Sequence, residues 1–107
     1  MNYDLAIIGG GAAGMAAAVF AAENGVRTVV IEHNRQLGKK LAITGKGRCN
    51  VTNNSDNDNI MKNIPTGSRF LYSALAGFSA YDTMNFFEGL GVPLKTERGN
   101  RVFPVSD

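Results

Sequence analysis

Cysteine is nearly absent from this chain of 107 residues, and the excess of one charge sign over the other is small. The single cysteine, Cys49, excludes a disulfide within the chain and suits a reducing compartment, so we expect a cytoplasmic protein. A formal net charge of +2 does not demand a nucleic-acid partner. The uncharged run from Leu5 to Ala22 follows Asp4 and contains three consecutive glycines, which argues against an export signal or a membrane span. We therefore expect neither nucleic acid nor membrane among the partners.

The hydrophobic content, 44%, is ordinary for a globular protein, and the length allows one domain at most. A complete dinucleotide fold with two mononucleotide halves needs roughly 150 residues or more. The chain also ends at Ser106-Asp107, which has the composition of a helix N-cap with no helix behind it. The expectation is an N-terminal portion of a longer protein.

The first third of the sequence has the pattern strand, helix, strand. The apolar run Tyr3–Ile8 predicts a strand buried on both faces, as in a parallel sheet. The alanine-rich stretch from Ala12 to about Asn24 predicts a helix that ends at Gly25, and Arg27–Glu32 is rich in β-branched residues and predicts a second strand. Residues 1–32 therefore form a βαβ unit.

The remainder of the chain alternates loop and helix signals. Residues 33–59 are predicted to be a loop, mobile near 53–59, because their polar tract has no apolar face to bury. Residues 68–78 and 79–90 predict a pair of helices, the second opened by a variant of the capping box with Ser79 and Asp82. Residues 94–97 and 101–103 flank a turn and predict a short hairpin. Residues 60–107 are thus helices and hairpin.

Between the first strand and the helix lies the sequence Gly9-Gly10-Gly11-Ala12-Ala13-Gly14, which satisfies G-x-G-x-x-G. Gly9 permits the tight turn, Gly11 lets a pyrophosphate approach the backbone, and Gly14 lets the helix pack close to the strand. The free N–H groups at the start of this helix form an anion site that needs no lysine. The hexapeptide alone is a weak signal, but a strand precedes it and a helix follows.

Glu32 ends the second predicted strand and strengthens the assignment. An acid at this place accepts hydrogen bonds from the adenosine ribose hydroxyls of a dinucleotide, and its charge disfavours a ribose 2′-phosphate. The fold class is therefore α/β: the N-terminal βαβ part of a Rossmann-like FAD/NAD(P)-binding domain, followed by a helical pair and a short β-hairpin. The glycines and the acid by themselves allow either NAD or FAD. No metal site is expected, because neither Gly45-Lys46 nor the Asp56–Asn59 run completes a P-loop or EF-hand pattern.

The segment from Gly38 to Asn53 reads GKKLAITGKGRCNVTN. It resembles the signature of the bacterial flavoprotein family that includes BaiN and YhiN, often labelled aminoacetone-oxidase-like. The runs Phe78–Asp82, Phe86–Glu88 and Arg101–Ser106 are also similar to that family, so the likeness covers essentially the whole chain. Members are several times longer than this chain, which the resemblance therefore places at their N-terminal end.

The resemblance implies a non-covalent FAD whose ADP half is held by the glycine turn and Glu32. It also implies a loop that runs along the cofactor, here residues 39–50. The cofactor-binding candidates are Gly9, Gly11, Ala12, Ala13, Gly14, Glu32, His33, Lys40, Thr44, Gly45, Gly47, Arg48, Cys49 and Asn50. For the loop residues the alternative is a solvated basic surface loop, and for Cys49 a packing role rather than redox catalysis.

The function that follows is the FAD-binding segment of a flavin-dependent oxidoreductase that acts on a small molecule, with NAD(P)H as a possible electron donor. No catalytic acid or base is identifiable in these residues. Three alternatives stay open: an NAD-binding segment, a segment of a tRNA-modifying flavoprotein, and a truncated piece that has no activity alone.

Overall fold

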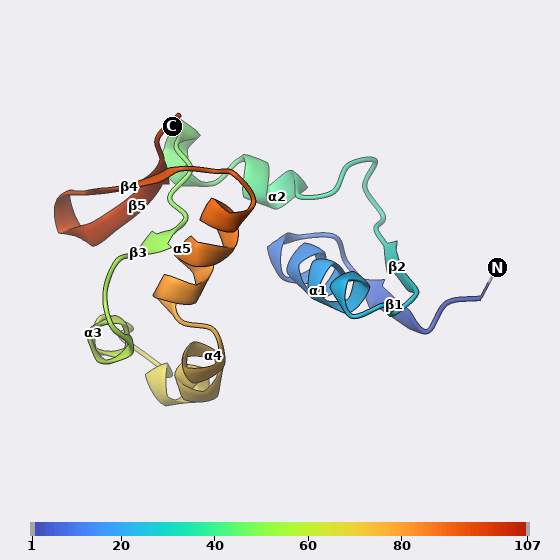
Figure 1. Cartoon of the computed structure of the whole chain (residues 1–107), viewed down its shortest axis with the longest axis horizontal. Coiled ribbons are helices and arrows are strands. Elements are labelled where there is room, and N and C mark those ends of the chain that lie inside the picture. Colours follow the sequence, from blue (N-terminus) through green and yellow to red (C-terminus); the bar gives the residue numbers. More distant parts are fainter. Residues whose placement is uncertain (1, 107) are drawn as a thin grey trace. The chain divides into compact units, whose positions relative to one another are not determined.

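The computed structural model describes residues 2–106 and divides them into two compact units, with the boundary after Gly47 (Figure 1). The boundary falls inside the segment that the sequence assigns to the cofactor-side loop. Each unit has its own small sheet and its own helices.

The first unit is a strand–helix–strand arrangement. Strand β1 (Leu5–Ile8) pairs in parallel with β2 (Thr28–Ile31), and α1 (Ala12–Glu23) connects them and packs against both. A short helix, α2 (Lys39–Ala42), and a 3-10 turn (Gly45–Gly47) complete the unit. The structure confirms the predicted α/β class and the Rossmann-type βαβ unit.

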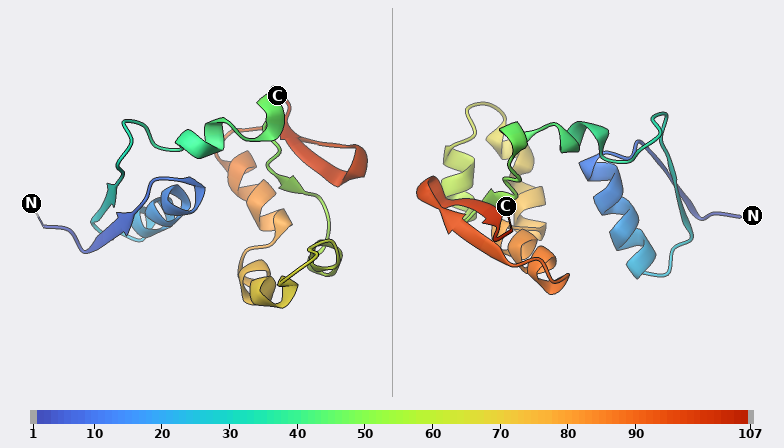
Figure 2. Two further views of the ribbon diagram at one scale, coloured as in Figure 1. Left: turned by 180° about the vertical axis from the view of Figure 1, so that it is seen from behind. Right: turned by 90° about the horizontal axis from the view of Figure 1, so that it is seen from above.

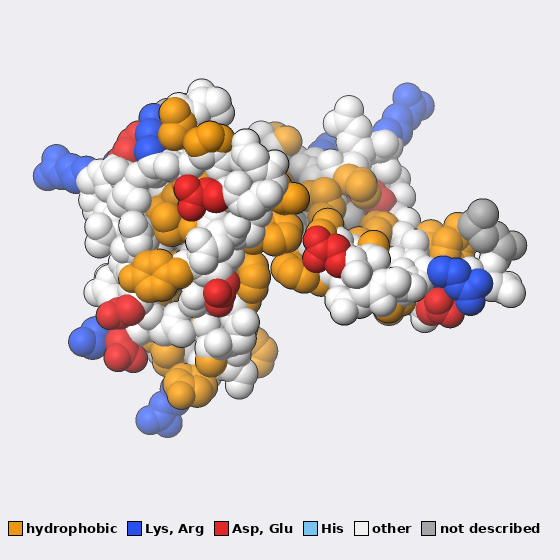
Figure 3. Space-filling model, viewed as in Figure 1, with side chains coloured by type: hydrophobic (Ala, Val, Ile, Leu, Met, Phe, Trp, Pro, Cys, Tyr) orange, Lys and Arg blue, Asp and Glu red, His pale blue; other side chains and the backbone are white. Residues whose placement is uncertain are grey.

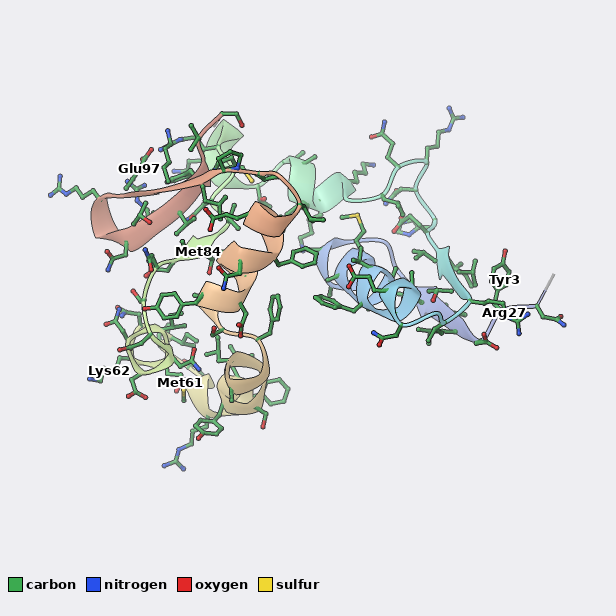
Figure 4. All side chains as sticks on the ribbon, viewed as in Figure 1. Tyr3, Arg27, Met61, Lys62, Met84 and Glu97 are labelled. Atoms are coloured by element: carbon green, nitrogen blue, oxygen red, sulfur yellow. The ribbon has the colours of Figure 1, made fainter. Side chains whose placement is uncertain are left out.

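The two parallel strands are tied together at their amino ends. The Arg27 guanidinium donates hydrogen bonds of 3.1 Å to both carboxylate oxygens of Asp4, and the Arg27 carbonyl accepts from the amide of Asp4 at 2.8 Å. Arg27 is labelled in Figure 4, at the strand end that carries no glycine turn. Because parallel strands share one carboxyl edge, this pairing places the turn after β1 beside the residues that follow β2.

The prediction that the first strand is buried on both faces is wrong for this structure. Ile8 is 80% exposed and Ile31 is 53% exposed, and neither strand has a buried side chain among the described residues. The reason is that this sheet has two strands and one packed helix, which leave part of the apolar surface uncovered. Figure 3 accordingly shows hydrophobic side chains on the visible surface of the molecule.

The second unit contains an antiparallel sheet in the order β3 (Thr52–Asn53), β5 (Arg101–Pro104), β4 (Leu94–Glu97). Its helices are α3 (Asn57–Lys62), α4 (Tyr72–Gly77) and α5 (Ala80–Gly89), with 3-10 turns at Ser68–Leu71 and Arg98–Asn100. Helix α5 packs against β3 and β4, as two further views show (Figure 2). The predicted helix pair and hairpin are confirmed.

The buried residues of the second unit come from β5, from α5 and from Ser55. Val102 is fully buried, Phe103 and Ala80 are 3% exposed, and Ser55 is buried with them. The predicted capping box opens α5: the Asp82 amide donates to Ser79 Oγ, and the Ser79 amide donates to the Asp82 carboxylate. Ser79 is therefore the N-cap of α5, the helix that packs against β3 and β4.

The polar tract that was expected to be a mobile loop near 53–59 is instead structured. Its first residues form β3, which pairs with β5, and Asp56 caps α3 by accepting a 2.8 Å hydrogen bond from the Asn59 amide. Asn53 and Asn54 donate to the Gly99 carbonyl and to Thr96 Oγ1. Asparagine side chains here satisfy backbone and turn groups, so the tract is fixed without an apolar face. Asp107, the last residue of the expected N-cap, lies outside the described residues.

Candidate dinucleotide-binding turn

The glycine turn lies at the carboxyl edge of the β1–β2 sheet and leads directly into α1. Gly9 has a φ of +97°, a conformation that side chains with a β-carbon rarely adopt. A β-carbon on Gly14 would overlap the Gly9 carbonyl oxygen and would lie 3.5 Å from Ile7 Cγ2. Both glycines are therefore needed for the tight turn and for the close approach of α1 to β1.

The amino end of α1 is open. Gly11 is the N-cap residue with extended backbone, and within residues 2–106 no side chain caps this end. The first helical hydrogen bond runs from the Met15 amide to the Gly11 carbonyl, so the amides of Ala12, Ala13 and Gly14 precede it. Gly11, Ala12 and Ala13 are exposed, and no described heavy atom lies within 4 Å of a β-carbon built on Gly11. Backbone donors and the helix dipole at such an end favour an anion such as a phosphate.

Glu32 lies immediately after β2 and is directed at the turn. Its Oε1 accepts a 2.8 Å hydrogen bond from the Gly10 amide, and its Oε2 accepts one of 2.8 Å from the Asn34 amide. The N–H donors of Asn34 and Gly10 hold the pKa of the Glu32 carboxyl below its usual value, against the opposing effect of burial. The carboxylate is thus ionised at neutral pH and adjoins the helix end.

His33 follows the acid, as the sequence shows, but its side chain is 91% exposed. Its Nδ1 lies 3.5 Å from Glu32 Oε2. The imidazole therefore lies beside the Glu32 carboxylate, with most of its surface open to solvent.

The remaining loop candidates of the first unit are exposed. Lys40 lies in α2, and Thr44 Oγ1 donates to the Leu41 carbonyl at 2.8 Å. Lys46, between Gly45 and Gly47, has a φ of 51°, so this turn keeps a side chain in the left-handed region. Such a backbone costs roughly 1–2 kcal/mol for a residue with a β-carbon.

The other three candidates belong to the second unit, where two of them support the local structure. Arg48 donates to both carboxylate oxygens of Glu97 at 3.1 and 2.8 Å, and its guanidinium stacks 3.7 Å from the Phe103 ring centre. Figure 4 labels Glu97 on β4. With its amide nitrogen turned toward them, Asn50 donates to the carbonyls of Thr52 and Val102. Cys49 is an exposed free thiol.

Four residues at the turn were not singled out by the sequence: Gly10, Asn34, Leu37 and Gly38. The Gly38 amide donates to the Gly10 carbonyl at 2.7 Å, and a β-carbon on Gly10 would overlap Leu37 Cδ2. The available signal was the extra glycine at position 10, which the G-x-G-x-x-G pattern leaves unspecified.

Within residues 2–106, no group of three or more His, Cys, Asp or Glu side chains is arranged to hold a metal ion. None of the helices described is long and apolar enough to cross a membrane.

The parallel βαβ unit, with a glycine turn and an acid at the end of the second strand, is the arrangement of a Rossmann-type domain. The chain belongs to the family described as "HI0933-like protein Rossmann domain", which matches residues 3–107.

Several curated proteins are similar to this chain. It is 35% identical over 105 residues to the 3-dehydro-bile acid delta(4,6)-reductase of Clostridium scindens, covering 96% of this chain and 25% of that protein. It is 33% identical over 91 residues to the ribosomal RNA dihydrouridine synthase of Escherichia coli, a match that covers 85% of this chain and 22% of that protein. A third relative, the 3-oxosteroid 1-dehydrogenase of Mycolicibacterium smegmatis, is 36% identical over 76 residues. This match covers 71% of this chain and 13% of that protein. The chain thus spans a quarter or less of the length of these relatives.

Proposed function

We propose that this chain supplies the FAD-binding part of a flavin-dependent oxidoreductase. The observation that carries the proposal is the open amino end of α1, beside the ionised Glu32 carboxylate. The amides of Ala12, Ala13 and Gly14 would hold the pyrophosphate, and Glu32 would receive the adenosine ribose hydroxyls. Each carboxylate oxygen has a second lone pair left for such a hydroxyl. FAD, when bound, supplies two-electron transfer chemistry.

The choice of FAD rests on the resemblance of the GKKLAITGKGRCNVTN segment to the BaiN and YhiN branch, which is the finer family assignment we propose. NAD fits the same turn and stays the alternative cofactor. A tightly held 2′-phosphate is disfavoured at this turn because it would approach the Glu32 carboxylate. NADPH or NADH would then serve as electron donor at another place in the protein. A reducing, cytoplasmic location belongs to the proposal and rests on the single cysteine.

The names of the relatives indicate a class of reaction. A delta(4,6)-reductase of a 3-dehydro-bile acid and a 1-dehydrogenase of a 3-oxosteroid both act on carbon–carbon bonds of a ring system that bears a ketone. A dihydrouridine synthase yields uridine with two added hydrogens, again in a ring that bears a carbonyl. We propose that the substrate has a carbon–carbon double bond conjugated to a carbonyl. Reduction of such a bond would require a hydride at the β-carbon, which reduced FAD would supply, and a proton from water at the α-carbon.

A small-molecule enone is the substrate we favour, in line with the near-neutral charge. A uridine of ribosomal RNA is the second candidate, because two relatives carry the synthase name, from Escherichia coli and Haemophilus influenzae. Disrupting the gene and measuring dihydrouridine in ribosomal RNA separates the two candidates. Loss of the modified base would favour RNA, and its persistence would favour the small molecule.

The cofactor proposal is tested with Gly11→Ala in the whole protein that carries this chain. No described atom blocks a β-carbon at position 11, so the variant should fold, while its methyl group occupies the space of the pyrophosphate. FAD affinity, followed by the visible absorption of retained flavin, should fall about tenfold or more, which corresponds to at least about 1.4 kcal/mol. Gly77→Ala, at a glycine of α4 that also has open surroundings, is the control and should leave FAD affinity unchanged. Wild-type protein that takes up no flavin when FAD is added would overturn the proposal.

A further inference from the structure

Gly10 differs in its burial from the other described residues of the first unit. Among residues 2–47 it is the only one that is buried, in a unit whose side chains are otherwise exposed or half-exposed. Its φ is not positive, so it is not a glycine for conformational reasons. The reason for a glycine at this buried position therefore lies in the residues around it.

Both backbone groups of Gly10 are held by residues that follow β2. Its amide donates to Glu32 Oε1 at 2.8 Å, and its carbonyl accepts from the Gly38 amide at 2.7 Å. The first hydrogen bond of α1 is accepted one residue later, by the Gly11 carbonyl. The contacts after β2 thus hold the residue that directly precedes the N-cap of α1.

The same Glu32 carboxylate also makes a hydrogen bond within the segment 32–38. Glu32 Oε2 accepts from the Asn34 amide, and the Glu32 side chain is 14% exposed. Leu37 covers Gly10 so closely that a β-carbon at position 10 would overlap Leu37 Cδ2. An ionised acceptor between two amides, sheltered from water, makes stronger hydrogen bonds than a neutral one.

We propose that residues 32–38 form a clasp that fixes the glycine turn in its anion-binding geometry before any cofactor arrives. Glu32 and Leu37 are its positioning residues, and both act through Gly10. The proposal rests on the proposed function and adds to it, since it gives Glu32 a task that does not depend on the ribose hydroxyls. Pre-ordering of the turn lowers the entropy that the cofactor must lose on binding.

The first test needs no ligand and uses amide hydrogen exchange read by mass spectrometry. Glu32→Gln keeps one acceptor oxygen but sets an NH₂ group against the second amide. Exchange should accelerate about tenfold or more in the peptides that hold Gly10 and Gly38. Glu23→Gln, the same change at an exposed acid of α1, should leave both peptides unchanged. Unchanged exchange at Gly38 in Glu32→Gln would show that the contacts do not act as one clasp.

The second test separates the clasp from a ribose contact by comparing ADP with 2′,3′-dideoxy-ADP. If Glu32 also acts through Gly10, Glu32→Gln weakens binding of the dideoxy compound by about tenfold as well. If Glu32 serves only the ribose, the loss appears with ADP and is absent with the dideoxy compound, and the clasp is overturned while the cofactor proposal stands. Wild-type protein that binds neither ADP nor FAD would instead refute the proposed function, whatever the exchange data show.

Leu37 supplies a further comparison that leaves the carboxylate in place. Leu37→Ala uncovers Gly10 and should accelerate its exchange, whereas Leu37→Met keeps a side chain of similar volume and should restore protection. Equal protection in Leu37→Ala and wild type would remove Leu37 from the clasp.

Discussion

Replacing Gly14 by alanine tests the close packing of α1 on the first strand. Alanine inside a helix is favoured over glycine by about 1 kcal/mol, so propensity alone predicts stabilisation. The new β-carbon, however, would overlap the Gly9 carbonyl oxygen and stand 3.0 Å from the Gly9 carbonyl carbon. These are backbone atoms of the tight turn and cannot rotate away as a side chain would. Relief requires a shift of α1, and overpacking of this kind costs roughly 1–3 kcal/mol and occasionally more.

We therefore expect Gly14→Ala to lower the free energy of unfolding by up to about 2 kcal/mol, which is the overpacking cost of roughly 1–3 kcal/mol less the gain of about 1 kcal/mol in helix propensity. Urea denaturation followed by circular dichroism measures this change. Gly89→Ala is the matched control, because it is also a helical glycine and no described atom lies within 4 Å of its β-carbon. It should raise stability by about 0.4–1 kcal/mol, the opposite sign. If both variants gain stability, the inferred contact between α1 and the glycine turn does not exist.

Two further predictions concern the second unit. Ser79→Ala removes the cap of α5 and should lower the free energy of unfolding, measured by urea denaturation, by about 1 kcal/mol. Ser73→Ala, at an exposed position of α4, should lower it far less. Equal effects of the two variants would contradict the capping role. The Arg48 side chain that donates to Glu97 holds the pKa of this carboxyl below its usual value. The stabilisation of the folded state by the Arg48–Glu97 pair is therefore fully present above the usual glutamate pKa, and it is lost as the pH falls through the lower pKa of Glu97 in the folded state. In Glu97→Gln, the free energy of unfolding should depend less on pH in the acid range than in the wild type. An unchanged dependence would refute the stabilising role of the Arg48–Glu97 pair.

The features that could be predicted from the sequence are those decided by short stretches of chain. The apolar runs at β1 and β2, the alanines of α1 and the capping box at Ser79 each have their cause within a few neighbouring residues. Gly9 and Gly14 could be assigned to a turn and to a close approach for the same reason. These predictions are confirmed by the structure.

The wrong predictions depended on partners far away in the chain. Nothing near Asn53 in the sequence indicates that it pairs with Arg101, so the tract around it was assigned to a mobile loop. The burial of the first strand was inferred from apolar composition alone, but burial depends on what covers a strand, and in this structure β1 has one neighbouring strand and one helix. The roles of the candidate residues toward a cofactor stay predictions.

The strand–helix–strand order and the glycine turn follow from local sequence, because steric limits and periodicity act between residues close together in the chain. The hydrogen bonds from Glu32 and Gly38 to Gly10, and the pairing of Arg48 with Glu97, depend on the tertiary fold. Such contacts join residues that are far apart in the chain and meet only when strands pair, so no local pattern specifies them. The glycine turn follows from the local sequence, whereas the clasp that fixes it follows from the fold.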